Sequence, residues 1–457
     1  MLTPSPKKQL LIWVLALLSL TGYIAIGYFL ERTEPFPLLT FYFALFGAYY
    51  FIWETINHKD SWVQPKWFNL DLVSWLAILF RVSFILAIPN LSDDFYRFIW
   101  DGRLLVAGIN PFSHLPSYYM EAENAIPGLT NELYTHLNSP GYFTIYPPVN
   151  QFIFWLSALI STDHIVGSVL IIRVFILMAE FGNIWLLPKV LEQYNLPKKA
   201  ASLYLLNPLV IIEGVGNLHF EVMMFFFIIL ALWWLKKDKL ILSALAIALA
   251  VATKLIPLMF MPFLPKPINL KRTAIYYAST GIALLILFLP LLSTELIEGL
   301  QSSLSLYYQK FEFNASIYFL LREQGFQEFG YNRIAFIGKD LVKWTFWLII
   351  ILAFWPLGKK PKLPTLFMFA LGIYLLLSTT VHPWYIITLV GLSVFTNYRS
   401  PVLWSATTFM TYIGYSASGY DLPTWVLFVE YGSLAAFFLF ELARELGFNH
   451  LVKLRIQ

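Results

Sequence analysis

The stretch Leu91-Ser-Asp-Asp-Phe-Tyr-Arg-Phe-Ile-Trp-Asp-Gly-Arg-Leu-Leu-Val-Ala-Gly-Ile-Asn-Pro-Phe112 combines charged and aromatic residues more densely than any other part of the chain. Ser92 is a suitable helix N-cap, and Asp93 and Asp94 would occupy the first turn, where the helix dipole favours carboxylates. Gly108 is a suitable helix stop. We therefore predict a short helix at a membrane surface that presents two carboxylates to a cavity.

The charged residues of this stretch are the main candidates for chemistry. Asp93, Arg97 and Asp101 are spaced four apart and would share one helix stripe. We expect Asp93 or Asp94 to be a general base that deprotonates a hydroxyl; the alternative is helix capping with an ion pair to Arg97. A purely structural role is less favoured, because carboxylates are costly at a membrane boundary. Arg97 and Arg103 could bind phosphate, although salt bridges to the neighbouring aspartates are the favoured alternative for each.

The composition is that of a polytopic membrane protein. Of 457 residues, 58% are hydrophobic and 13% are charged, and the mean hydropathy is +0.66. A soluble protein averages about 25% charged residues. The net charge of +4 therefore gives no reason to expect nucleic-acid binding. The chain has no cysteine, which excludes disulfides and thiolate metal sites, and residues 1–30 do not resemble a cleavable signal.

Apolar runs predict 11 to 14 transmembrane helices in a single domain, 1–457. Several runs, such as 255–265, are too short for a full crossing and are expected to be broken or re-entrant. With a cytoplasmic N-terminus, roughly two thirds of the lysines and arginines fall in inner loops, as the positive-inside rule requires. Both termini would then be cytoplasmic. The expected spans are 10–30, 38–56, 68–90, 165–188, 200–213, 218–235, 240–253, 255–265, 273–292, 341–357, 364–380, 383–397, 401–417 and 423–443.

Two long loops, 91–164 and 293–340, would then lie outside, and 149–161 would form a second interfacial helix. Further unusual polar residues fall at the same face. His219 and Glu221 lie in one turn; they could bind substrate or metal, or be ordinary interfacial residues. Lys254 follows an apolar run and could meet an anionic lipid head or snorkel to the interface.

The segment His382-Pro-Trp-Tyr385 adds another histidine, and Trp384 and Tyr385 offer faces for a sugar ring or belong to an aromatic belt. Three ionisable residues, Arg81, Arg173 and Glu180, lie inside predicted spans. They are functional candidates unless they satisfy one another by pairing.

The chain resembles the bacterial GT-C membrane glycosyltransferases, in particular their polyprenyl-phosphate-sugar-dependent, mannosyltransferase-like branch. The first outer-loop motif carries this resemblance, in Ser92 to Arg103 with Gly108-Ile-Asn-Pro-Phe112. Later motifs extend it over most of the chain: Tyr146-Pro-Pro148, Asn207-Pro208, Gly216-Asn-Leu-His219, Ala252-Thr-Lys254, Phe313-Asn-Ala-Ser-Ile-Tyr318 and His382-Pro-Trp-Tyr385.

The resemblance implies an all-α GT-C-like bundle in a bacterial inner membrane. It also implies an inverting transfer of a hexose, with mannose as the family default, from a polyprenyl-phosphate donor at the outer face. The acceptor would be a hydroxyl of a glycan, lipid or protein. An acid of the first outer loop would be the base, and Lys254, Arg322 and His382 would stabilise the leaving phosphate.

The adjacent acids depart from the family's Asp-x-Asp and Asp-Glu patterns, so the choice of base stays open. We expect no cofactor or protein-bound metal, although a divalent metal is possible. The alternative function is a transporter or flippase of lipid-linked saccharides, which would need polar residues distributed through the membrane depth. Their concentration at one face favours the enzyme.

Overall fold

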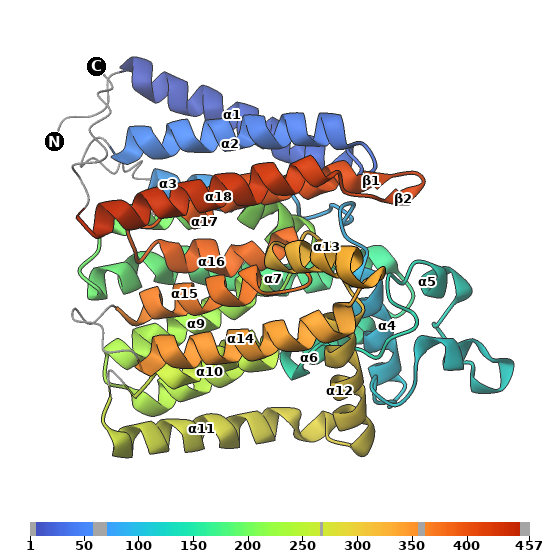
Figure 1. Ribbon diagram of the computed structural model, residues 1–457. Coiled ribbons are helices and arrows are strands. Elements are labelled where there is room, and N and C mark those ends of the chain that lie inside the picture. Colours follow the sequence, from blue (N-terminus) through green and yellow to red (C-terminus); the bar gives the residue numbers. More distant parts are fainter. Residues whose placement is uncertain (1–5, 58–70, 266–267, 355–361, 448–457) are drawn as a thin grey trace.

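The fold is a bundle of helices with almost no sheet, as the sequence predicts (Figure 1). The computed structural model describes residues 6–57, 71–265, 268–354 and 362–447. The strands in these ranges are β1 (Tyr415–Ser416) and β2 (Gly419–Tyr420), which form one antiparallel hairpin. The longer helices are α1 (Pro6–Tyr28), α2 (Pro35–Asn57), α7 (Ile165–Gln193), α9 (Glu221–Lys236), α11 (Leu270–Phe288), α12 (Thr294–Gln309), α14 (Ile334–Phe354) and α18 (Thr424–Glu445).

Shorter helices complete the bundle and the long loops at its α4 end. They are α3 (Leu72–Val82), α4 (Asp94–Val106), η1 (Pro116–Met120), η2 (Ala122–Asn124), α5 (Asn131–Thr135), α6 (Pro148–Ile160), η3 (Lys198–Ala201), α8 (Ser202–Leu205), η4 (Val210–Gly216), α10 (Leu240–Thr253), η5 (Ile256–Phe263), η6 (Leu289–Leu291), α13 (Ile317–Phe329), α15 (Leu363–Leu376), η7 (Pro383–Tyr385), α16 (Ile386–Ser393), α17 (Ser400–Thr407) and η8 (Thr408–Gly414).

Helices long and apolar enough to cross a membrane confirm the membrane class. In the described residues there are five, α1, α2, α7, α18 and α11 with η6, or six if η4 and α9 form one broken span. The axes of η4 and α9 meet at 108°. Most other predicted spans are short or interrupted, as expected for 255–265, where η5 stands. The predicted span 341–357 instead falls on α14, with 355–357 outside the described residues. The count of 11 to 14 crossings stays a prediction.

Charged residues inside the bundle have protein groups as partners. Arg81 and Glu180 are fully buried and form an ion pair of 2.5 Å, so the predicted mutual pairing is confirmed for them. Tyr204 adds a hydrogen bond of 2.7 Å to Glu180. Arg173 instead donates to the carbonyl oxygens of Val215 and Gly216, at 3.1 and 3.0 Å, near the end of η4. These contacts secure the broken segment that forms one wall of the site described below.

The two ends of the bundle differ. At the end where α1 begins and α18 ends, basic residues come together around Tyr194: Lys236 lies over its ring and Lys362 donates to its carbonyl. At the other end, α4, α5 and the hairpin lie together, and α4 and α12 run across the long helices (Figure 1). The first predicted outer loop thus folds as α4 to α6, and 149–161 is helical as predicted.

Candidate active site

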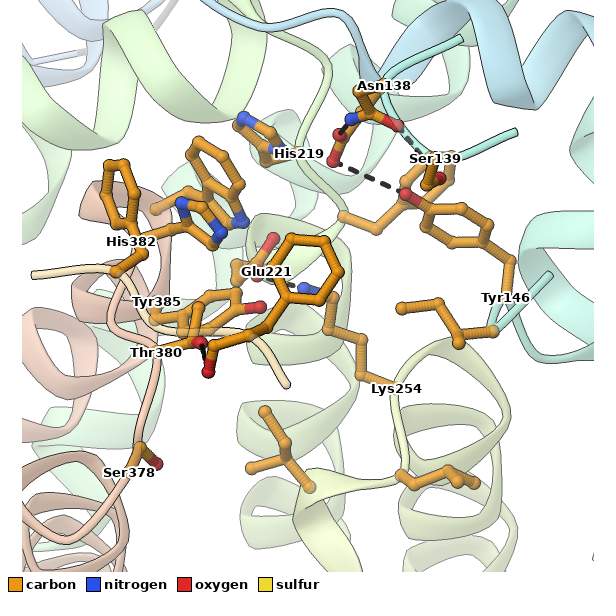
Figure 2. Close-up of a pocket in the computed structure, with 18 of the residues that line it drawn as sticks. Asn138, Ser139, Tyr146, His219, Glu221, Lys254, Ser378, Thr380, His382 and Tyr385 are labelled. Carbon is orange, nitrogen blue, oxygen red and sulfur yellow. Dashed lines mark hydrogen bonds and ion pairs between the residues drawn. The ribbon is translucent and has the colours of Figure 1, made fainter. Parts of the chain in front are cut away.

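A cavity of about 830 Å³ lies at the α4 end of the bundle. It is lined by the start of α4, the segment 138–147, the break between η4 and α9, the segment 254–259, part of α14, and the segments 311–313 and 378–385. Figure 2 shows His219 and His382 on one side, Asn138 and Tyr146 on the other, and Lys254 with Glu221 between them. Segments far apart in the sequence therefore combine charged and aromatic groups in one chamber.

Asp93 and Asp94 both line this cavity, but they have different partners. Helix α4 begins at Asp94 with Asp93 as its N-cap, so the predicted N-cap Ser92 was wrong by one residue. Ser92 Oγ still accepts a hydrogen bond from the Asp94 amide, at 3.3 Å. Asp93 pairs with Arg32, from the loop between α1 and α2, at 2.5 Å. The helix stops as expected, because Gly108 adopts φ +76°.

The Asp94 carboxylate is held by neutral donors. Asn138 donates to it at 2.6 Å and the Tyr146 hydroxyl at 3.3 Å. Burial raises the pKa of Asp94 above its ordinary value, while the Asn138 hydrogen bond and the charge of Lys254 act in the opposite direction. A carboxylate that faces a cavity with a raised pKa is suited to accept a proton.

Arg97 and Asp101, further along α4, anchor the helix to neighbouring segments. Arg97 borders the cavity, but its guanidinium pairs with Asp101 at 2.8 Å and donates to the Tyr142 carbonyl at 2.9 Å. Asp101 is fully buried and also receives bonds from Thr144 at 2.5 Å and Gln151 at 2.9 Å. The favoured salt bridge of Arg97 to a neighbouring aspartate is therefore confirmed with Asp101, whereas the alternative in which Asp93 or Asp94 pairs with Arg97 is wrong.

Like Asp101, the predicted substrate-binding residues Arg103 and Arg322 do not line the cavity. Arg103 donates to the carbonyl of Gly128, in the loop between η2 and α5. Arg322 on α13 pairs with Glu312 at 2.7 Å, and Glu312 is the member of this pair that lines the cavity. Because Asp101, Arg103 and Arg322 do not line the cavity, they are left out as substrate contacts.

Lys254 and Glu221 form an ion pair across the cavity wall. Lys254 follows α10 in an extended conformation, and Glu221 is the first residue of α9, directly after the broken segment. Glu221 is buried, whereas the Lys254 side chain is 21% exposed, and its ammonium lies 5.0 Å from the Tyr385 ring centroid. The sequence pattern at Pro257 predicted such an irregular cavity wall, and the structure confirms that the helix is interrupted there.

Aromatic rings form a stack on the wall that faces Asn138 and Tyr146. The Trp384 indole stacks with His219 at 3.8 Å and with His382 at 4.3 Å between ring centroids. His382 in turn packs on Phe313 at 4.4 Å. The face of Tyr385 is turned to Lys254. The rings expected to stack on a sugar are thus engaged with protein groups, and the two histidines are the polar members of this wall.

Sequence reasoning missed several residues of the cavity. Arg32 carries a basic charge in a loop expected outside, which is unusual under the positive-inside rule and could have drawn attention to it. Asn138 lies in an Asn-Ser-Pro-Gly turn that is common in loops, so no local signal marks it. In the described ranges, no group of three or more His, Asp or Glu side chains is arranged to hold a metal ion.

The fold and the cavity define a class: an all-α integral membrane protein with carboxylates and a lysine around a chamber at one end of the bundle. The comparison with known families is more specific. A family described as alpha-(1→6)-mannopyranosyltransferase, N-terminal domain, matches residues 17–266. The chain belongs to this family.

Individual relatives share about a quarter of their residues with the chain over the aligned part. The chain is 24% identical over 199 residues to alpha-(1→6)-mannopyranosyltransferase A of Corynebacterium glutamicum, covering 43% of this chain and 38% of that protein. It is 24% identical over 193 residues to the Mycobacterium tuberculosis protein of the same name, covering 42% and 35%. For alpha-(1→6)-mannopyranosyltransferase B of Corynebacterium glutamicum the identity is 25% over 161 residues, covering 35% and 25%. The matched part thus spans less than half the length of these relatives.

Proposed function

We propose that the protein is a mannosyltransferase that moves a mannosyl group from a polyprenyl-phosphate donor to an acceptor hydroxyl, with inversion at the anomeric carbon. The observation that carries this proposal is that one cavity contains both a carboxylate suited to accept a proton and a cation. Asp94 is held by neutral donors on one side, and Lys254 places a cation in the same chamber. An acid that accepts a proton and a cation that meets a leaving phosphate are the two groups that this transfer needs.

The chemistry follows from these positions. Asp94 accepts the proton of the acceptor hydroxyl as the oxygen attacks the anomeric carbon from the side opposite the phosphate. The bond between the anomeric carbon and the phosphate oxygen breaks, and the lipid phosphate leaves with the electron pair. Lys254 stabilises the charge that develops on this phosphate. Asp93, neutralised by Arg32, is the weaker candidate for the base because its charge already has a partner at 2.5 Å.

The apolar part of the cavity supports a lipid-linked donor. Leu255, Ile256 and Met259 lie on the chain after Lys254, and Phe346 and Ile349 on α14 also line the chamber. An apolar wall next to a charged centre fits a substrate with a hydrocarbon chain and a phosphate head. Metal-free transfer is part of the proposal, and the acceptor is a hydroxyl of a glycan, lipid or protein.

The distribution of charge supports an outer position for this cavity. Lys236, Lys362 and Arg399 lie in or beside loops at the end of the bundle away from α4. Under the positive-inside rule this basic end is cytoplasmic, with both termini, in a bacterial inner membrane, and the cavity opens to the outer side. The charges deeper in the bundle, at Arg81 and Glu180, pair with each other. This arrangement favours an enzyme over a transporter of lipid-linked saccharides.

A donor screen tests the proposal. Membranes containing the protein are incubated with radiolabelled polyprenyl-phosphate mannose, polyprenyl-phosphate glucose or a nucleotide-linked mannose, and the product linkage is determined by NMR. We expect transfer from polyprenyl-phosphate mannose, with the anomeric configuration of the donor inverted. Transfer from the nucleotide sugar alone, or a product with retained configuration, would overturn the proposal.

A further inference from the structure

The buried carboxylate of Glu213 lies next to His219, one of the two histidines in the cavity wall. Glu213 belongs to η4, the π-helical segment before the break, and its side chain is 0% exposed. Its carboxylate accepts hydrogen bonds from the Tyr412 hydroxyl at 2.7 Å and the Asn217 amide at 3.0 Å. Its Oε2 also lies 3.5 Å from Nε2 of His219.

His219 is held to the same segment by its backbone. Its amide donates to the carbonyl oxygens of Glu213 and Gly214, at 3.3 and 3.1 Å, and its ring stacks on Trp384. In the described part of the chain, Nε2 makes no hydrogen bond, and the Glu213 carboxylate, 3.5 Å away, is the acid paired with it. The ring therefore has one face on an indole and one nitrogen facing a carboxylate, and it lines the cavity.

The choice of a carboxylate at this position calls for an explanation. Three buried acids, Glu180, Asp101 and Glu221, pair with Arg81, Arg97 and Lys254, respectively, whereas the buried Glu430 and Glu441 accept from the Trp404 indole and from backbone amides. Across the described residues, Glu213 has no arginine or lysine at ion-pair distance, and its one partner of basic type is His219. The two carboxylate oxygens accept separately, Oε1 from Tyr412 and Oε2 from Asn217, and Oε2 is also the atom that faces His219. A glutamine offers only one acceptor oxygen and could not accept from both donors.

We propose that Glu213 is a positioning residue that acts through His219. By accepting the Nε2 proton, Glu213 fixes the tautomer of the ring and leaves Nδ1 as an acceptor. His219 would then receive a hydrogen bond from a sugar hydroxyl in the cavity. The role rests on the proposed sugar transfer, and it adds a group that does not itself contact substrate.

A double-mutant cycle tests this role. Glu213→Gln, His219→Ala and the double variant are purified in detergent, and kcat and KM are measured with polyprenyl-phosphate mannose. We expect Glu213→Gln to lower kcat by about tenfold in the native background and by less than about twofold when His219 is already alanine. Tyr412→Phe, which removes one donor to Glu213, should show a smaller effect with the same dependence on His219. Glu441→Gln is the matched control: this buried carboxylate accepts from the backbone amides of Arg399 and Ser400, at the basic end.

The outcomes separate this inference from the proposed function. If the wild type transfers mannose and the losses of the two single variants multiply independently, Glu213 has only a structural role and the inference is wrong. The same cycle is measured on the thermal shift caused by polyprenyl-phosphate mannose in the absence of acceptor, a condition that requires no sugar transfer. Coupling in that shift supports the Glu213–His219 unit even if mannose is not the transferred sugar. Absence of any shift and any transfer in the wild type would overturn both.

Discussion

The Asp94 carboxylate accepts a hydrogen bond from the Asn138 amide at 2.6 Å, a contact that joins the first turn of α4 to a loop 44 residues later. This bond favours the ionised form of an acid whose pKa burial has raised. Its neighbour Asp93 has a fixed cation in Arg32 instead. The two adjacent acids therefore have different chemistry, which their sequence alone does not reveal.

The Asn138 contact predicts a shift in the pH dependence of transfer. Because a base must be ionised, the rate should fall as the pH drops through the raised pKa of Asp94. Asn138→Ala removes a donor to the ionised carboxylate, so this acid limb should move to higher pH. Tyr146→Phe, which loses a longer bond of 3.3 Å, should move it less. The pH profile of kcat/KM measures both; a limb that stays in place in Asn138→Ala would contradict the assignment.

Variants of the Lys254–Glu221 pair should change stability and activity independently. Lys254→Gln leaves Glu221 buried without its cation, so we expect a loss of about 2 kcal/mol in stability, less than for a fully buried pair because Lys254 is partly exposed. The double variant Lys254→Gln/Glu221→Gln should recover that stability. Both should lose about 100-fold in kcat if Lys254 stabilises the leaving phosphate. Thermal unfolding and transfer rates measure the two effects; full activity of the double variant would exclude this role.

The packing of α4 on α6 fixes the position of the two acids, so disturbing this packing should reduce activity. A Cβ at Gly102 would collide with the backbone carbonyl of Phe154, whereas Gly372 on α15 has no atom within 4 Å of that position. Gly102→Ala should therefore displace α4, lower the thermal stability and reduce transfer by at least about tenfold, because sub-ångström shifts of catalytic groups are costly. Gly372→Ala is the control and should retain both. Normal activity in Gly102→Ala would show that α4 tolerates displacement.

The buried pair of Arg81 and Glu180 predicts a stability effect without a role in chemistry. Arg81→Met leaves Glu180 buried and uncompensated, which should cost about 3 kcal/mol. The exposed pair of Lys343 and Asp340 offers a control, since Lys343→Ala should have no measurable effect. Unfolding in detergent measures both. Equal unfolding temperatures for Arg81→Met and the native protein would contradict the structural role.

The sequence was most informative where composition and local chemistry decide the structure. Apolar runs predicted the helical bundle. The stretch that forms α4 predicted a short helix with two carboxylates facing a cavity, and Lys254 with Pro257 predicted an interrupted helix at a cavity. Partners across the bundle were not predictable, because Arg32 and Asn138 meet the acids only after folding. The spacing of Arg97 suited either an ion pair to Asp93 or one to Asp101. In the structure Asp93 is the N-cap and pairs with Arg32, and Arg97 pairs with Asp101.

The most direct measurement compares Asp94→Asn with Asp93→Asn in the transfer of radiolabelled mannose from a polyprenyl-phosphate donor, with folding checked by thermal unfolding. If Asp94 is the base, Asp94→Asn should lose about 1,000-fold in kcat, in the range of general-base catalysis, and Asp93→Asn about tenfold or less. A folded Asp94→Asn variant with near-native transfer would contradict the account.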